Sequence, residues 1–247
     1  MSSSSSSKVA FVTGANRGIG FETARELGEA GVTVVIGSRD LAKGQEAAAK
    51  LQAKGIQAFA IAFDGADSAT FQAAYDYFEK EHGKLDILVN NAGIMIETLA
   101  GENSSTVSPD ILRKTFDTNF FAVVESTQIL LPLVKKAPSG RIVNVSSILG
   151  SLTLHSTPGS PIEFAKAFAY NASKTVLNAF TVHLAHELKD TPIKVNSAHP
   201  GWVKTELGGQ EAPVEVEDGG KTSARLALLP DDGPTGGYFY LEDTLPW

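Results

Sequence analysis

Short apolar segments rich in β-branched residues alternate with longer segments of helical periodicity along most of this 247-residue chain. The apolar segments are nearly continuous in Val, Ile and Ala, which is typical of strands in a sheet buried on both faces. Seven such strands are expected, at residues 9–13, 32–36, 58–62, 87–89, 141–145, 194–198 and 237–241. Because helical segments separate them, the pattern predicts an α/β fold with a doubly wound, mainly parallel, seven-stranded sheet.

The helical segments and the ends of the chain define the expected domain. Helices are predicted over residues 18–30, 40–53, 68–82, 109–134 and 169–189. No internal repeat or interdomain linker is visible, so residues 8–247 are expected to form one domain. Residues 1–7 are Met1 and six serines, a segment too polar and too simple in composition to pack. We expect a disordered tail there, either native or added to the chain.

Composition excludes several classes of partner. The net charge is −7, and no block of Lys and Arg marks a surface for nucleic acid or for an anionic membrane. The chain has no cysteine, which excludes disulfides, thiolate metal sites and Cys nucleophiles. No apolar run is long enough for a transmembrane helix or for the core of a signal peptide. We therefore expect a cytoplasmic protein that acts on small molecules and holds no metal.

Two segments interrupt the alternation of strands and helices. Residues 148–168 follow the fifth predicted strand, and residues 201–214 follow the sixth. Both begin at the carboxyl end of a strand, where open α/β sheets bind their ligands. Irregular segments of this length in a compact domain are usually functional lids or disordered loops. We favour lids.

A glycine-rich segment lies between the first strand and the first helix. Its sequence is Thr13-Gly14-Ala15-Asn16-Arg17-Gly18-Ile19-Gly20, with the spacing G-x-x-x-G-x-G. Glycines permit a tight turn and the close approach of backbone to a pyrophosphate, whose charge the helix N-terminus stabilises. The segment therefore predicts a dinucleotide site.

The end of the second strand indicates which dinucleotide binds. Ser38 and Arg39 lie where, in an NAD-binding protein, an acidic residue would accept a hydrogen bond from the ribose 2′-hydroxyl. Arg17 can approach the same place from the glycine-rich segment. Two guanidinium groups suit the 2′-phosphate of NADP. Asp40 is the competing candidate for the ribose, although it is better explained as the cap of the next helix. We favour NADP(H) over NAD(H).

Tyr170 and Lys174 are four residues apart on a predicted helix and so share one face. A positive Lys174 close to the phenol would lower the pKa of Tyr170 from about 10 and make it a proton donor near neutral pH. The spacing alone is weak evidence, because ordinary helices carry such pairs by chance.

The ordered set of motifs resembles the classical branch of the short-chain dehydrogenase/reductase family across residues 8–247. After the glycine-rich segment come Asp64 beyond the third strand, Asn90-Asn91-Ala92-Gly93 after the fourth, Asn119 in the fourth helix, Ser146-Ser147 ending the fifth strand, Tyr170 with Lys174, and Pro200-Gly201-Trp202-Val203-Lys204-Thr205. The resemblance implies a single Rossmann-type domain. It also implies reversible hydride transfer between a nicotinamide and a carbonyl or alcohol carbon.

The resemblance also implies roles for individual residues. Tyr170 would donate the proton, Lys174 would bind the nicotinamide ribose, Ser147 would orient the carbonyl oxygen, and Asn119 would hold a water beside Lys174. Ser147 is preferred to Ser146 because it directly precedes x-x-G. The implied cofactor contacts are Gly14, Asn16, Arg17, Gly18, Ile19, Gly20, Arg39, Asp64, Asn91, Ala92, Gly93, Tyr170, Lys174, Pro200, Gly201, Val203 and Thr205.

The segment between Ser147 and Tyr170 is longer than in the plainest family members and is similar to the insert of the carbonyl-reductase-like subgroup. By that likeness it would cover the active site and obstruct a subunit interface, so a monomer or homodimer is favoured and a tetramer stays open. Its apolar residues would either line a pocket for an apolar ketone or pack the insert onto the body. These residues are Leu152, Leu154, Phe164 and Phe168.

The leading functional hypothesis is an NADPH-dependent reductase of a ketone or aldehyde. An NAD-linked alcohol dehydrogenase is one alternative, and a dinucleotide-sensing protein without turnover is another. His183 and His186 lie three apart on a helix, but solvated side chains explain them better than metal ligation. A pocket-lining role for His199 is the less favoured interpretation of that residue.

Overall fold

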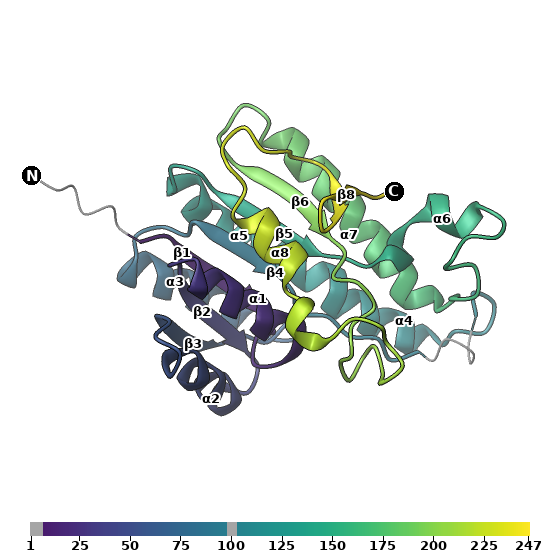
Figure 1. Ribbon diagram of the computed structural model, residues 1–247, viewed down its shortest axis with the longest axis horizontal. Coiled ribbons are helices and arrows are strands. Elements are labelled where there is room, and N and C mark those ends of the chain that lie inside the picture. Colours follow the sequence, from purple (N-terminus) through teal and green to yellow (C-terminus); the bar gives the residue numbers. More distant parts are fainter. Residues whose placement is uncertain (1–6, 98–102) are drawn as a thin grey trace, which may run out of the picture.

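The computed structural model describes residues 7–97 and 103–247 and has one twisted sheet with helices on both faces (Figure 1). The sheet order is β3-β2-β1-β4-β5-β6-β7-β8. Its strands are β1 (Val9–Thr13), β2 (Thr33–Ser38), β3 (Ala58–Ala62), β4 (Ile87–Asn90), β5 (Arg141–Val145), β6 (Lys194–Ala198), β7 (Tyr238–Tyr240) and β8 (Asp243–Thr244). The first seven are parallel, which confirms the predicted doubly wound α/β fold. A two-residue β8 adds antiparallel to β7 and was not expected.

The helices are α1 (Gly18–Glu29), α2 (Leu41–Gln52), α3 (Ala69–Glu81), α4 (Pro109–Phe116), α5 (Ala122–Lys136), α6 (Leu152–Ser156), α7 (Phe168–Glu187) and α8 (Lys221–Ala227). The predicted helix over 109–134 is divided by a π-helical turn, Asp117–Phe121. The short helices α6 and α8 were not predicted. Residues 1–6 of the predicted serine tail lie outside the described residues, as do residues 98–102.

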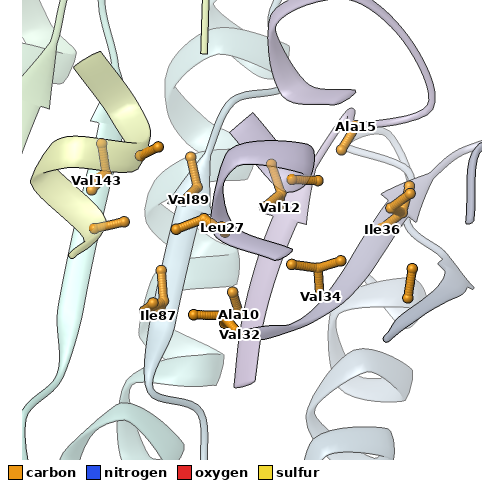
Figure 2. Packing of buried hydrophobic residues seen from close by; sticks show 14 of the residues in the cluster. Ala10, Val12, Ala15, Leu27, Val32, Val34, Ile36, Ile87, Val89 and Val143 are labelled. Atoms are coloured by element: carbon orange, nitrogen blue, oxygen red, sulfur yellow. The ribbon is translucent and has the colours of Figure 1, made fainter. Parts of the chain in front are cut away.

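Two apolar layers hold the helices against the sheet. Alternate residues of β1 supply opposite layers, with Ala10 and Val12 on one side and Val9 and Phe11 on the other. The first layer packs α1, α2 and α8, and the second packs α3, α5 and α7. Figure 2 shows Leu27 of α1 packed among sheet residues of the first layer, including Val12 and Val89. Burial of both faces explains why the strand sequences are continuous in apolar residues.

A row of buried polar side chains crosses the sheet near the carboxyl ends of its strands. Asn90 donates to Asn144 Oδ1 at 2.8 Å, and Asn144 donates to Thr181 Oγ1 at 2.8 Å. Ser197 donates to the same hydroxyl at 2.8 Å. These bonds join β4, β5, β6 and α7 directly beneath the loops where a ligand is expected.

Within residues 7–97 and 103–247, no helix is long and apolar enough to cross a membrane.

Candidate active site

The glycine-rich segment follows β1 and is pressed against the loop after β4. Gly14 and Gly18 have positive φ values of 65° and 57°. A Cβ added at Gly14 would lie 2.9 Å from the Cα of Ala92, and one at Gly20 would lie 2.4 Å from Nδ2 of Asn91. These positions therefore require glycine because two backbone segments approach closely. The segment ends at the N-terminus of α1, where backbone N–H groups and the helix dipole favour a phosphate.

Asn91 and Ala92 brace this segment. The side-chain amide of Asn91 donates to the carbonyl oxygens of Thr13 at 2.8 Å and Gly14 at 3.3 Å. The backbone N–H groups of Asn91 and Ala92 both donate to Thr13 Oγ1 at 3.0 Å. The structure thus assigns both residues a supporting contact with the predicted phosphate loop, while their contact with a cofactor stays a prediction.

Ser147, Tyr170 and Lys174 meet where β5 ends and α7 begins. The Ser147 hydroxyl lies near the phenol of Tyr170 and accepts a hydrogen bond from Leu149 N at 3.3 Å. Lys174 Nζ donates to Val145 O at 2.9 Å and lies 5.7 Å from the centroid of the Tyr170 ring. Ser146 is buried instead, with its hydroxyl donating to Lys174 O at 3.4 Å. Ser147 thus lies beside the phenol, and its preference over Ser146 as the catalytic serine stays a prediction.

The pKa of Tyr170 reflects the burial of its phenol. Burial of the phenol raises its pKa from 10.0 to about 12, and the nearby Ser147 hydroxyl lowers it by less. Burial also lowers the pKa of Lys174 from 10.5 to about 8. Desolvation of the phenolate therefore dominates the pKa of Tyr170 in the protein alone, and the expected lowering by Lys174 stays a prediction.

Asn119 lies in the π-helical turn, a feature often found at functional sites. Its Oδ1 accepts from Ile94 N at 2.8 Å, and its Nδ2 donates to Ile94 O at 2.8 Å and to Ser173 Oγ at 3.0 Å. A Cβ at Gly93 would lie 3.3 Å from Lys174 Nζ, so glycine leaves room for the lysine there. Asn119 thus ties the loop after β4 to α7, and its predicted hold on a water stays untested.

The loop after β6 returns to the glycine-rich segment. Val203 is buried and forms a bridge with Val214, which closes residues 201–214 into a compact loop. Gly201 has φ 91° and lies too close to Tyr240 and Val214 for a larger residue. The side chain of Thr205 lies against Gly18, since a Cβ there would be 3.6 Å from Thr205 Cγ2. Pro200, Gly201, Val203 and Thr205 therefore lie at the same edge as the predicted phosphate site.

The predicted 2′-phosphate site lies at the exposed end of β2. Arg39 is exposed there, whereas the Ser38 hydroxyl is buried and donates to Asp40 O at 2.8 Å. Asp40 accepts from Ala42 N and Lys43 N at 3.1 and 3.3 Å, which confirms its interpretation as the cap of α2. Arg17, also exposed, forms an ion pair with Glu206 of the loop after β6.

The predicted adenine contact, Asp64, is partly exposed after β3. Its Oδ1 accepts from Ala66 N at 3.0 Å, and its backbone N–H donates to Thr70 Oγ1 at 3.0 Å. Asn16 is half-buried in the glycine-rich segment. Neither position tests the predicted contact.

Two buried residues support the site: the sequence contains no signal for Glu97, and it suggests His199 only as a pocket-lining residue. His199 Nδ1 accepts from Ile148 N at 3.2 Å, next to Ser147, and burial lowers the pKa of the ring to about 4. Glu97, in the loop after β4, accepts from the backbone N–H groups of Ala169 and Tyr170 at 3.0 and 2.8 Å. His199 therefore supports the turn after Ser147 rather than presenting a free imidazole.

A family model described as short chain dehydrogenase matches residues 8–215. The chain belongs to the short-chain dehydrogenase family. Carbonyl reductase (NADPH) 1 of Mus musculus is 33% identical over 99% of this chain and 100% of that relative. Short-chain dehydrogenase/reductase 1 of Saponaria officinalis is 32% identical over 97% and 96%. The expected likeness to carbonyl reductases within the family is confirmed, and the chain is an oxidoreductase.

Solved short-chain dehydrogenase structures share this fold. Salutaridine reductase from Papaver somniferum superposes with a TM-score of 0.80 at 31% identity, covering 94% of this chain and 99% of that one. NADPH-bound carbonyl reductase from chicken fatty liver gives a TM-score of 0.84 at 26% identity, covering 98% and 94%.

Residues 148–168, the insert expected from the sequence, follow β5 and include α6. Leu152 and Phe164 are 63% and 69% exposed, so they do not pack the insert onto the body. Ile162 and Ala165, which are buried, do so instead. In Figure 1 the insert and α6 project at one end of the molecule.

Proposed function

We propose that this protein is an NADPH-dependent reductase that converts a ketone or aldehyde to an alcohol. The observation that carries the proposal is the meeting of Ser147, Tyr170 and Lys174 beside a glycine-rich segment whose cradle a Cβ would fill. The relatives named as NADPH carbonyl reductases and the NADPH-bound solved structure support the same reaction and cofactor. When bound, NADPH would supply the hydride.

Tyr170 would act as the proton donor in the reductive direction. Burial raises the pKa of its phenol to about 12, so the side chain is neutral near pH 7 and carries the proton that an oxygen gaining charge would take. Ser147, whose hydroxyl lies near the phenol, would hold the carbonyl oxygen and stabilise its developing charge.

Lys174 would bind the ribose next to the nicotinamide and return a proton to the phenol. Its Nζ lies 5.7 Å from the centroid of the Tyr170 ring, and burial lowers its pKa to about 8. Lys174 can therefore exchange protons near neutral pH. The first turn of α1 would hold the diphosphate. Arg17 and Arg39, both exposed at the same edge, would bind the 2′-phosphate.

A panel of structurally varied ketones and aldehydes, followed by absorbance of the reduced nicotinamide, tests the activity. Tyr170→Phe should lose roughly 10²–10⁴-fold in kcat while its affinity for NADPH stays within about twofold. Tyr77→Phe, the same change at a half-buried site on α3, serves as the matched control. Tight NADPH binding with no turnover of any compound would support a dinucleotide sensor instead.

Cofactor preference is tested separately. Because both arginines are exposed, their bonds to a phosphate are weakened by solvent, and Arg39→Ala should weaken NADPH binding by about tenfold. Binding of NADH should not change, and neither should the affinity of Arg113→Ala, which removes an exposed arginine of α4. An unchanged preference for NADPH in Arg39→Ala would remove the role given to this residue, and equal affinities in the wild type would favour the NAD-linked alternative.

A further inference from the structure

Glu97 brings a carboxylate to the N-terminus of the helix that carries Tyr170. It belongs to the loop after β4 and is only 5% exposed. One carboxylate oxygen accepts from Ala169 N at 3.0 Å and the other from Tyr170 N at 2.8 Å. The carboxylate therefore binds two adjacent N–H groups in the first turn of α7.

The helix has no capping group of its own. Its N-cap residue is Ala167, which has no side-chain acceptor, and its first turn contains no acidic residue. The first N–H groups of a helix have no partner inside the helix and carry its positive dipole end. Two charge-assisted bonds from a buried carboxylate satisfy both needs at this position.

A second set of bonds joins the same loop to the same turn. Asn119 holds both backbone groups of Ile94 and donates to Ser173 Oγ at 3.0 Å. Ser173 in turn donates to Tyr170 O at 2.7 Å. The backbone of Tyr170 is thus fixed at its N–H by Glu97 and at its carbonyl through Ser173. The first restraint comes from the loop after β4, and the second from Asn119, which also holds that loop at Ile94.

We propose that Glu97 is a positioning residue that fixes the first turn of α7 so that the Tyr170 phenol stays in contact with Ser147. The inference deepens the proposed function and rests on it for the effect on catalysis. Without the carboxylate, the N–H groups of Ala169 and Tyr170 lose these acceptors, and the first turn of α7 is held less firmly. A displaced phenol then spends less time within reach of a substrate oxygen, which lowers kcat more than binding.

Three variants at Glu97 and one control test the role. Glu97→Gln keeps the size of the side chain but only one acceptor, Glu97→Asp keeps the charge but shortens the reach, and Glu97→Ala removes both. Asp231→Asn is the control, because this carboxylate also binds a buried group, Arg141, but at the opposite edge of the sheet. Glu97→Gln guards against a simple failure of Glu97→Ala to fold.

The kinetic readout separates positioning from binding. We expect kcat to fall about tenfold in Glu97→Gln and about 100-fold in Glu97→Ala, with KM for the carbonyl compound and Kd for NADPH within about twofold of wild type. Glu97→Asp should recover no more than part of the loss. Asp231→Asn should keep the wild-type kcat. Wild-type kcat in Glu97→Ala, or a fall no larger than that in a control of equal melting temperature, would overturn the proposal.

Hydrogen exchange tests the contact without turnover. In Glu97→Ala and Glu97→Gln the amides of Ala169 and Tyr170 should exchange about tenfold faster or more than in wild type, while the C-terminal half of α7 keeps its rate. Unchanged exchange at these two amides would overturn the positioning role of Glu97, even in a protein that reduces no carbonyl compound. If wild type reduces no carbonyl compound while these amides exchange faster in the variants, the proposed function fails and the positioning of α7 by Glu97 is supported.

Discussion

Lys174 places an ammonium group in the interior, and its replacement by methionine should make the protein more stable and inactive. The side chain is only 4% exposed, and the bond that its Nζ makes, within the described residues, is to Val145 O at 2.9 Å. Burial lowers the pKa of the amine from 10.5 to about 8, because one carbonyl oxygen does not replace the water lost by the charge. The unfolded chain holds that proton more tightly than the folded protein does.

The size of the effect follows from the shift in pKa. At pH 7 the charged lysine lowers the free energy of unfolding by roughly 3 kcal/mol relative to a group without this shift. Methionine fills similar volume without the charge, and it forfeits a hydrogen bond of about 1 kcal/mol. Lys174→Met should therefore be more stable than wild type by about 2 kcal/mol at pH 7. Reductase activity should be lost, since the stabilised variant has no group to bind the ribose.

Denaturant unfolding at several pH values measures the effect. Between pH 8 and 10 the unfolded chain binds more protons at this lysine than the folded protein, so wild-type stability should rise with pH by roughly 2 kcal/mol. The difference in unfolding free energy between Lys174→Met and wild type should shrink by the same amount. The window ends near pH 10, because above it the raised pKa of Tyr170 makes the folded protein less stable as pH increases.

The control is Lys189→Met, which replaces an exposed lysine beyond the end of α7. The difference in unfolding free energy between this variant and wild type should stay constant from pH 7 to 10. A difference between wild type and Lys174→Met that stays constant from pH 7 to 10 would refute the argument. So would a Lys174→Met protein less stable than wild type at pH 7.

Three further predictions concern charged or titrating side chains. Glu206→Gln releases Arg17 from its ion pair. In a fluorescence titration NADPH should then bind roughly threefold more tightly at low salt, and the gain in affinity should be smaller at high salt. An equal gain in affinity for NADH would contradict the role of Arg17. Burial lowers the pKa of His199 to about 4, so the unfolded state binds the proton first as pH falls below 6.5. Stability should thus fall by roughly 3 kcal/mol down to pH 4 because of this group, and His199→Asn should lose that part of the slope in denaturant titrations. Arg141 is buried and donates to carbonyl oxygens including that of Leu229 at 2.8 and 3.0 Å. Arg141→Met should cost roughly 3 kcal/mol in unfolding free energy with cofactor preference unchanged, and a loss below 1 kcal/mol would show that these bonds contribute little.

Most of the fold could be predicted because the central strands are buried on both faces. β1 and β2 contain the continuous apolar runs 9–12 and 34–36, a pattern that is visible without knowledge of the neighbouring strands. The helix α8 and the strand β8 are too short for any period to be visible. The π-helical turn within residues 109–134 was also hidden, since its residues keep ordinary helical spacing. Length therefore limited the prediction more than composition did.

The site divides in the same way between local and non-local causes. Tyr170 and Lys174 share a helix face, and Ser147 ends a strand at the edge where parallel sheets bind ligands, so their proximity could be predicted. The direction of the Tyr170 pKa shift could not be predicted, because it depends on how completely α7 and its surroundings exclude water from the phenol. Spacing shows which charges are near, but not how far each is desolvated.

The contact of Glu97 with the start of α7 could be predicted from the sequence only in part. The residue lies 72 positions from Ala169, and nothing in its own surroundings in the sequence marks it as a helix cap. The start of α7 does carry a signal, since Ala167, Phe168 and Ala169 offer no side-chain acceptor for a helix of 20 residues. A buried helix end without a cap must find its acceptors elsewhere in the chain. The missing cap therefore predicts that some distant polar group binds this turn, although only the fold shows that it is Glu97.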